Sequence, residues 1–426
     1  MKNMKFLSLA VAALALSACG TKTTNTKIVI WATAAEEAVI KDVVGTYNKE
    51  HSSNPIEYEF KAVSEADAGT TLGKDPTLKG APALFLCADD HIYNLQSKNI
   101  ILEITGSRAS TVKKNNTEAS FIGASYNDKL YGYPVTSDNG FFLWYNSEVI
   151  SETEAGSLEA LLKKAKDSGK KVLLDISNGW YAGTFLMSPS ACGTSSLTWR
   201  ENEKGQVVYD TTWDNEAGVK VSEYAYNLLK PYYDDGIFVV GSNEVIIDGF
   251  ENGTMVAAVS GTWMENNLKT AMGAKASYLK ASKLPEYHPD GEDKAGYQMA
   301  TFTGSKLYAI NKTRPVEEQK TADALAQLLT SKEAQLRRFE IRQSLPCNIE
   351  AQKDERYTKN TTIGGAALNA QVAAAAAVQS TSAQDRYWSV GELIGKTYIG
   401  ASALPQGQTW AQFLKTQMDG LRNPAV

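Results

Sequence analysis

Short apolar runs alternate along the chain with amphipathic stretches. The apolar runs at 27–32, 83–88, 171–177, 255–260 and 304–311 are typical of buried strands, and 56–63 alternates apolar and polar residues like a strand. Strands that alternate with helices predict parallel sheets covered by helices on both faces. The pattern restarts after residue 146. The sequence therefore predicts an α/β fold with more than one sheet.

Helices are expected between these strands. A Thr33-x-x-Glu36 capping box precedes a segment whose apolar residues recur at helical spacing. That apolar face contains Val39, Ile40, Val43, Val44 and Tyr47. Further helices are predicted at 89–98, 158–166, about 215–229 and about 321–339, and an alanine-rich helix around 372–378.

Polar and aromatic residues follow the predicted strands. Asp89 comes after 83–88, Trp180 and Tyr181 follow the turn at 178–179, and Trp263 follows 255–260. In open α/β sheets, ligands bind beyond the carboxyl ends of the strands. Tryptophan offers a large apolar face with a polar edge, which suits contact with a bound ligand. Core packing is the ordinary alternative for any one tryptophan.

The N-terminus has the three regions of a secretory signal peptide. A basic start, an apolar run at 6–16 and a small-residue end at Ser17 and Ala18 precede Cys19. Leu16 to Cys19 resembles the lipobox of bacterial lipoproteins, which implies cleavage after residue 18 and lipidation of Cys19. Two acyl chains anchor a protein stably. We expect a polar tether over 19–27 and export to the outer face of the cell membrane; an ordinary signal peptide with an incidental cysteine is the alternative.

Composition argues against several classes of function. The net charge of −5 and the lack of a Lys/Arg stripe disfavour nucleic acid as a partner. Besides Cys19 there are three cysteines, an odd number that permits at most one disulfide, and their spacings match no metal site. The three histidines are far apart in sequence. We expect no metal and no cofactor.

Three stretches carry a family resemblance, and they occur in the family's order. They are GKDPTLKGAPALFLCADDHIYNLQSKNIILEIT (73–105), NDKLYGYPVTSDNGFFLWYN (127–146) and FENGTMVAAVSGTW (250–263). This set resembles the extracellular solute-binding proteins of carbohydrate ABC importers, in particular the maltose/maltodextrin-binding proteins. The resemblance implies a two-lobed, periplasmic-binding-protein-like α/β fold (type II) with a ligand cleft between the lobes.

The resemblance also implies a division of the chain. Lobe one is expected to contain 28–137 and 304–345, and lobe two 138–303 and 346–426. By this interpretation Tyr131–Pro134 closes lobe one, 137–140 crosses between the lobes, and Phe141–Asn146 begins lobe two. Gly140 would relax the backbone at a hinge. The alternative for Ser-Asp-Asn-Gly is a β-hairpin turn.

The ligand-binding residues implied by the resemblance are mostly strand-end residues. Stacking aromatics are expected at Trp180, Trp263 and Trp388, with Tyr181 as a neighbour. Hydrogen-bonding residues are expected at Asp89, Asp138, Asn139 and Glu36, although Glu36 could serve only the start of its helix. Where the maltose-binding pattern has a tryptophan before the aspartate, this chain has Leu86 and Cys87. The remaining tryptophans are expected to pack.

The implied function is capture of a maltodextrin-like oligosaccharide for an ABC permease, by a monomer that closes around its ligand and performs no chemistry. A cell-surface carbohydrate hydrolase is the alternative, with Asp89 and Asp138 as its carboxyl pair. A penicillin-interacting enzyme is another, since S-x-x-K occurs at Ser110 and Ser277 and S-D-N at Ser137. K-T-G is absent. An adhesin using the same fold is a further possibility.

Overall fold

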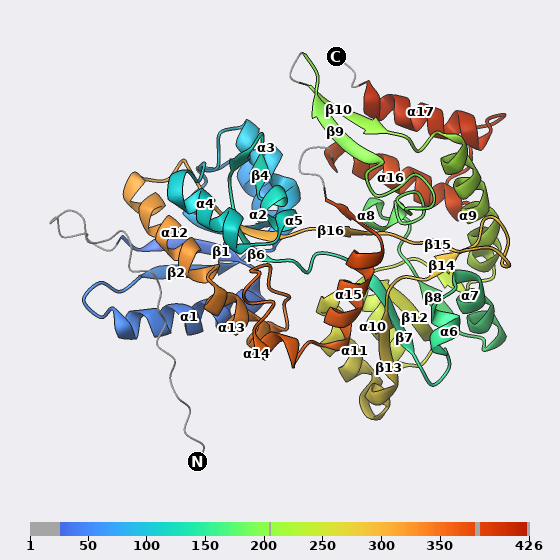
Figure 1. The fold of residues 1–426 in the computed structure, drawn as a ribbon, viewed down its shortest axis with the longest axis horizontal. Coiled ribbons are helices and arrows are strands. Elements are labelled where there is room, and N and C mark those ends of the chain that lie inside the picture. The colour runs from blue at the N-terminus through green and yellow to red at the C-terminus, as the bar shows by residue number, and fades with distance from the viewer. Residues whose placement is uncertain (1–25, 204–205, 380–383, 424–426) are drawn as a thin grey trace. The chain divides into compact units, whose positions relative to one another are not determined.

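The computed structural model describes residues 26–203, 206–379 and 384–423. The chain divides into two compact units (Figure 1). Of the described residues, those up to Thr136 and Ser305–Asn360 form unit 1, and those of Ser137–Gly304 and from Thr361 onward form unit 2. Residues 346–360, expected in lobe two, therefore belong to unit 1. There the Cys347 backbone N–H donates to Gln335 Oε1 at 2.8 Å, which ties this segment to a helix of the same unit.

Unit 1 is built on a sheet with strand order β2-β1-β3-β17-β6. Its strands and 3-10 helices are β1 (Ile28–Ala32), η1 (Ala34–Glu36), β2 (Tyr58–Ala62), β3 (Leu84–Ala88), η2 (Asp89–His91), β4 (Ser125–Tyr126), β5 (Lys129–Leu130), β6 (Tyr133–Thr136) and β17 (Lys306–Ile310). Its helices are α1 (Glu37–Glu50), α2 (Glu65–Lys74), α3 (Ile92–Ser97), α4 (Gly106–Asn115), α5 (Glu118–Gly123), α12 (Val316–Leu329), α13 (Lys332–Arg342) and α14 (Glu355–Thr358).

Unit 2 is built on a sheet with strand order β11-β8-β12-β7-β13. Its strands are β7 (Phe142–Asn146), β8 (Lys171–Leu173), β9 (Leu197–Glu201), β10 (Val207–Thr211), β11 (Phe238–Val239), β12 (Met255–Ser260), β13 (Leu279–Ser282), β14 (Glu286–Tyr287), β15 (Tyr297–Gln298), β16 (Thr301–Thr303) and β18 (Ala376–Val378). Its helices are α6 (Glu152–Ala155), α7 (Leu158–Asp167), α8 (Gly179–Ala182), α9 (Glu216–Asp234), α10 (Asn243–Glu251), η3 (Thr262–Met264), α11 (Glu265–Met272), η4 (Gly273–Tyr278), α15 (Ile363–Ala374), α16 (Gln384–Tyr398) and α17 (Trp410–Arg422).

Each main sheet is mixed rather than parallel, which corrects the sequence prediction. In unit 1, β17 runs antiparallel to both β3 and β6. In unit 2, β7 runs antiparallel to both β12 and β13. β7 is the first strand after the chain enters unit 2 at Ser137, and β17 is the first strand after it returns to unit 1 at Ser305. The residues that precede β7 and β17 consequently lie at the edge where the neighbouring parallel strands end.

The structure differs from the predicted helices at three places. The predicted helix at 321–339 is interrupted, because the Ser331 side chain accepts from the Ala334 backbone N–H and starts α13 as a separate helix. The Thr33 side chain makes no capping hydrogen bond, so the predicted capping box does not form. The alanine-rich stretch ends as a helix at Ala374 and continues as β18, which pairs with β16.

The hydrophobic periodicity correctly predicted the buried face of α1. Val39, Ile40, Val43 and Val44 are all buried in unit 1, and Tyr47, predicted on the same face, is half-buried. The helix is therefore oriented by its apolar stripe, as expected for an amphipathic helix against a sheet.

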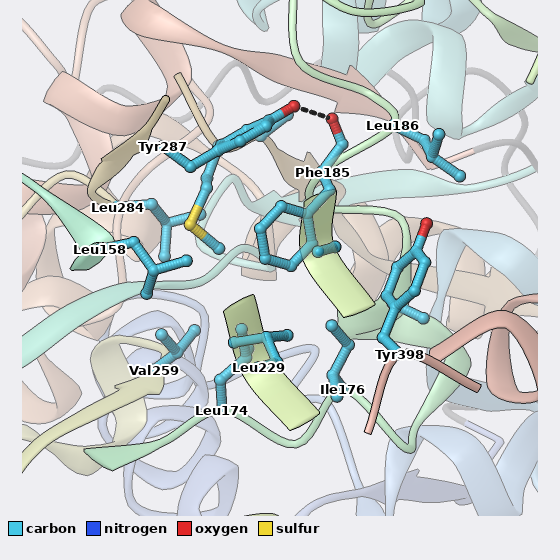
Figure 2. Packing of buried hydrophobic residues seen from close by; sticks show 14 of the residues in the cluster. Leu158, Leu174, Ile176, Phe185, Leu186, Leu229, Val259, Leu284, Tyr287 and Tyr398 are labelled. Carbon is cyan, nitrogen blue, oxygen red and sulfur yellow. Dashed lines mark hydrogen bonds between the residues drawn. The ribbon is translucent and has the colours of Figure 1, made fainter. Parts of the chain in front are cut away.

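The core of unit 2 lies between its sheet and the helices and loops around it. Figure 2 shows residues from separate segments of unit 2 packed together, including Leu158, Leu174, Phe185, Leu229 and Tyr287. The Tyr287 hydroxyl donates to the Phe185 carbonyl at 2.7 Å, so this buried polar group is satisfied.

No helix among the described residues combines the length and the hydrophobicity needed to cross a membrane.

Candidate functional site

Three segments of unit 2 bring aromatic residues to one edge of its sheet. Helix α8 follows β8, and η3 follows β12. Because β7 is antiparallel to β12, with Phe142 opposite Ser260, Phe141 enters at the same edge. We call the cluster of Phe141, Trp180, Tyr181 and Trp263 the aromatic platform. β6 and β7 lie in different sheets, so the Ser-Asp-Asn-Gly segment is not a β-hairpin turn.

The rings of the aromatic platform contact one another closely. The Trp180 ring lies 6.0 Å from that of Trp263, with an interplanar angle of 35°. Trp180 also meets Phe141 and Tyr181 in edge-to-face geometry at 4.9 Å each. Trp263 is 39% exposed, whereas Trp180 and Tyr181 are half-buried. Phe141 is fully buried, so the exposed surface of the platform comes from Trp263, Trp180 and Tyr181.

The backbone on either side of each tryptophan is fixed by local contacts. The Asn178 side chain caps α8 by accepting from the Trp180 backbone N–H at 2.9 Å. Trp263 folds back over Gly261, where a Cβ would lie 2.1 Å from a ring carbon. The buried Trp144 donates from Nε1 to the Gly261 carbonyl at 3.2 Å. Gly261 thus allows a ring position that a larger residue would block.

Gly140 is required for close packing rather than for an unusual backbone conformation. It is not among the glycines with positive φ. A Cβ at Gly140 would lie 2.8 Å from both the Phe302 carbonyl and Leu368 Cδ1. The next residue, Phe141, donates from its backbone N–H to Thr301 Oγ1 at 2.9 Å. Within unit 2 the expected hinge glycine is therefore held tightly.

Asn139 is joined to the aromatic platform by a residue that the sequence did not indicate. Asn139 Nδ2 donates to Gln379 Oε1 at 3.3 Å, and Trp180 Nε1 donates to the same oxygen at 3.2 Å. Gln379 follows the alanine-rich stretch, which carried no signal for a polar site. Asp138, beside Asn139, is buried at the start of unit 2.

Trp388 adjoins the platform through the backbone. Its carbonyl oxygen packs against Gly179, where a Cβ would approach it to 2.4 Å. Its ring is half-buried and contacts Phe302 and Tyr387. Of the five tryptophans expected to pack, Trp31, Trp144, Trp213 and Trp410 are buried, and Trp199 is half-buried against the core of unit 2.

Asp89 lies at the carboxyl end of β3 in unit 1 and is fully buried. Its backbone N–H donates to the Ser305 carbonyl, and its Oδ2 accepts from the Ser305 N–H at 3.0 Å. Within the described residues Oδ1 has no hydrogen-bond partner. Burial, together with the charge of Asp90, raises the pKa of the Asp89 carboxyl well above its ordinary value. This carboxyl retains an unused acceptor.

Glu36 is an internal ion-pair partner in unit 1, which corrects its assignment as a ligand contact. Its carboxylate accepts from Arg338 Nε at 3.0 Å, from Arg342 and, at 3.3 Å, from the Tyr308 hydroxyl. Burial raises the pKa of Glu36, but the charges of the two arginines outweigh burial and hold the pKa at about 2. The Glu36 carboxylate is fully buried and is bonded to three residues of unit 1, so it stabilises that unit.

The remaining candidate chemistry is dispersed. Cys87, Cys192 and Cys347 are unpaired, and the described residues contain no group of three metal-type ligands. Ser110 lies on α4, where its hydroxyl donates to the Gly106 carbonyl. Ser277 lies in η4 of unit 2. The first S-x-x-K motif therefore lies within α4, whereas the second runs from η4 into β13.

The structure is similar to solved structures of sugar-binding proteins. The maltodextrin-binding protein from L. casei without ligand has 18% identity and a TM-score of 0.76, covering 94% of this chain and 99% of that one. The maltose-binding protein from Listeria monocytogenes with maltose has 18% identity and a TM-score of 0.72, with the same coverage. A structure described as "with acarbose" has 24% identity and a TM-score of 0.77, covering 93% of this chain and 99% of that one.

No curated protein matches the sequence. The family model for bacterial extracellular solute-binding proteins matches residues 42–365, a range that includes most of unit 1, the whole of Ser137–Gly304 in unit 2 and the start of α15. Members of this family and the structural neighbours are binding proteins rather than enzymes. The α/β architecture, the aromatic platform at the strand ends and this match lead to one conclusion: the chain belongs to the bacterial extracellular solute-binding proteins.

Proposed function

We propose that this protein captures a maltodextrin-like oligosaccharide outside the cell and delivers it to the membrane subunits of an ABC transporter. The observation that carries the proposal is the aromatic platform, with the 39% exposed Trp263 beside the half-buried Trp180. Indole faces in this setting suit the apolar faces of sugar rings. Similarity to proteins described as maltodextrin- and maltose-binding supports the same ligand class.

Polar partners for the sugar hydroxyls are proposed on both units. In unit 2 they are Asn139 and Asp138, with Tyr181 and Trp388 as further neighbours of the ligand. In unit 1 the proposed partner is Asp89, whose Oδ1 has no hydrogen-bond partner within the described residues. A sugar hydroxyl donates as well as accepts, so it would satisfy that oxygen.

Isothermal titration calorimetry with a sugar panel tests the ligand class. We expect maltotriose and maltotetraose to bind, and cellobiose and free glucose to bind more weakly or not at all. Equal affinity for maltotetraose and cellotetraose would contradict the maltodextrin assignment. Absence of heat with every α-glucan would contradict the proposed function itself.

The proposed anchor is a diacylglyceryl group on Cys19, which lies outside the described residues. The family is extracellular, which implies export, and the lipobox-like sequence before Cys19 supports a membrane tether. Labelling cells with an alkyne fatty acid should label the wild type and Cys192→Ser, whereas Cys19→Ala should lose the label. Label retained by Cys19→Ala would contradict lipidation at this residue.

A further inference from the structure

Gln379 joins three separate segments of unit 2 at one atom. The residue follows β18 and is 3% exposed. Its backbone N–H donates to the Thr303 carbonyl at 2.9 Å, which continues the pairing of β18 with β16. Its side-chain Oε1 accepts from Trp180 Nε1 at 3.2 Å and from Asn139 Nδ2 at 3.3 Å. One carbonyl oxygen thus connects α8, the segment before β7 and the end of β18.

The chemistry of the indole fixes the orientation of both amides. Tryptophan Nε1–H is a donor only, so the group that faces it must be the carbonyl oxygen of Gln379. Because that oxygen is an acceptor, Asn139 must present its amide nitrogen to it. Within the described residues, no protein partner is found for Gln379 Nε2 or Asn139 Oδ1. The hydrogen bonds among Trp180, Asn139 and Gln379 thus leave Gln379 Nε2 as a donor and Asn139 Oδ1 as an acceptor for other groups.

Two kinds of contact hold the Trp180 ring. It meets Phe141 and Tyr181 edge-to-face, and its indole N–H donates to Gln379. A directed hydrogen bond from the indole edge restricts the rotation of the ring. An apolar residue at 379 would fill the space but would leave the Trp180 N–H and the Asn139 amide without their acceptor.

We propose that Gln379 is a positioning residue that holds the Trp180 indole in its ligand-stacking orientation. The hydrogen-bond array stands on the geometry of unit 2, whereas its effect on affinity rests on the proposed function. An acceptor at 379 keeps the indole in one orientation before the sugar arrives. The binding cost of ordering the ring is thereby reduced.

Two substitutions separate the acceptor from the rest of the side chain. Gln379→Leu removes the acceptor, whereas Gln379→Glu keeps an oxygen that can accept from both donors. The first readout needs no sugar: the indole ¹⁵N–¹H resonance of Trp180, assigned by its loss in Trp180→Phe. We expect Gln379→Leu to shift this resonance and to speed its exchange with water. Gln379→Glu should keep it protected.

The second readout is affinity for the α-glucan that wild type binds. Gln379→Leu should weaken binding about tenfold, the scale of one lost directed hydrogen bond, and Gln379→Glu should restore most of it. In a Trp180→Phe background, which lacks the indole N–H, Gln379→Leu should weaken binding much less. Thermal melts followed by circular dichroism identify any variant that fails to fold.

Different results would contradict the positioning role of Gln379 and the proposed sugar-binding function. An unchanged Trp180 resonance in folded Gln379→Leu would overturn the positioning role, whatever the protein binds. An equal loss of affinity from Gln379→Leu in both backgrounds would also overturn it, because the effect would not pass through the indole. A wild-type protein that binds no sugar but shows the expected resonance shift would contradict only the proposed function.

Discussion

Trp263 and Trp180 differ in how far the fold depends on them. Trp263 is exposed and reaches the aromatic platform by folding over Gly261. Trp180 is half-buried, contacts Phe141 and Tyr181, and donates to Gln379. Removing the Trp263 ring should mainly lower affinity for the ligand. Removing the Trp180 ring should also lower the stability of unit 2.

Trp263→Ala should lower sugar affinity roughly thirtyfold, since a buried aromatic anchor commonly contributes about 2 kcal/mol or more to binding. The melting temperature should hardly change, because an exposed ring contributes little to the core. Calorimetric titration and thermal melting on the same sample measure both quantities. Tyr278→Ala is the control, because Tyr278 is 43% exposed but lies in η4, outside the platform. A destabilised Trp263→Ala with wild-type affinity would assign Trp263 to the fold.

Glu36→Gln should destabilise unit 1 by about 3–5 kcal/mol, the usual cost of removing one partner from a buried ion pair. Arg338 would be left buried without its counter-charge, with Arg342 beside it. Sugar affinity measured on the folded variant should be unchanged, since Glu36 is an internal residue. Urea unfolding monitored by circular dichroism measures the change in the free energy of unfolding.

The ion pair should also make stability depend on pH. The folded-state pKa of Glu36 is about 2, below the ordinary value of 4.5. The stabilisation is therefore fully present above pH 4.5 and is lost as pH falls toward 2. The difference in unfolding free energy between wild type and Glu36→Gln should shrink over this window. A difference that stays constant from pH 6 to pH 3 would contradict the ion-pair explanation.

At the scale of elements, glycines determine how closely α16 packs in unit 2. Gly391 and Gly395 lie one turn apart on the helix. A Cβ at Gly395 would lie 1.8 Å from the Ile176 carbonyl, and one at Gly391 would lie 3.2 Å from Gly179 Cα. The strand-end segment that carries Trp180 is thus packed directly against the helix backbone.

Gly395→Ala should destabilise unit 2 by about 1–3 kcal/mol, because an added methyl group overpacks the contact with Ile176. The matched control is Gly420→Ala on α17, where a Cβ would meet nothing within 4 Å. That control should stabilise by up to about 1 kcal/mol, as alanine is the better helix former. Thermal melting distinguishes the two, and a Gly395→Ala protein as stable as Gly420→Ala would show that α16 can move away without cost.

The sequence predicted elements better than the contacts between them. Periodicity identified the buried face of α1, and the sequence placed Trp180 and Trp263 each after a predicted strand. Their contact depends on the order of β8 and β12 in the sheet. The reversal of β7 and β17 could not be predicted, since strand direction depends on where the chain enters each unit. Gln379 was missed for a similar reason: its role depends on β18 pairing with β16 across a long sequence separation.

At the scale of the molecule, the chain passes between the units repeatedly. It leaves unit 1 after Thr136, returns at Ser305 and leaves again after Asn360. The first visit supplies β1, β2, β3 and β6, but the strand between β3 and β6 is β17, from the second visit. The partners of Glu36, including Arg338, also come from the second visit. The sheet and the buried ion pair of unit 1 therefore form only when the segment up to Thr136 and the segment Ser305–Asn360 are both present.

Residues 26–136 alone should therefore fail to fold, whereas 26–136 joined to 305–360 should fold cooperatively. In the shorter fragment β3 and β6 lack their shared neighbour, and Glu36 lacks its arginines. In the joined fragment a short Asn-Gly-containing turn can replace 137–304, because Thr136 and Lys306 are opposite each other in an antiparallel pair. Circular dichroism and urea unfolding would compare the two fragments. A cooperative transition in 26–136 alone would contradict the dependence on β17, and a joined fragment without one would show that unit 1 needs unit 2 to fold.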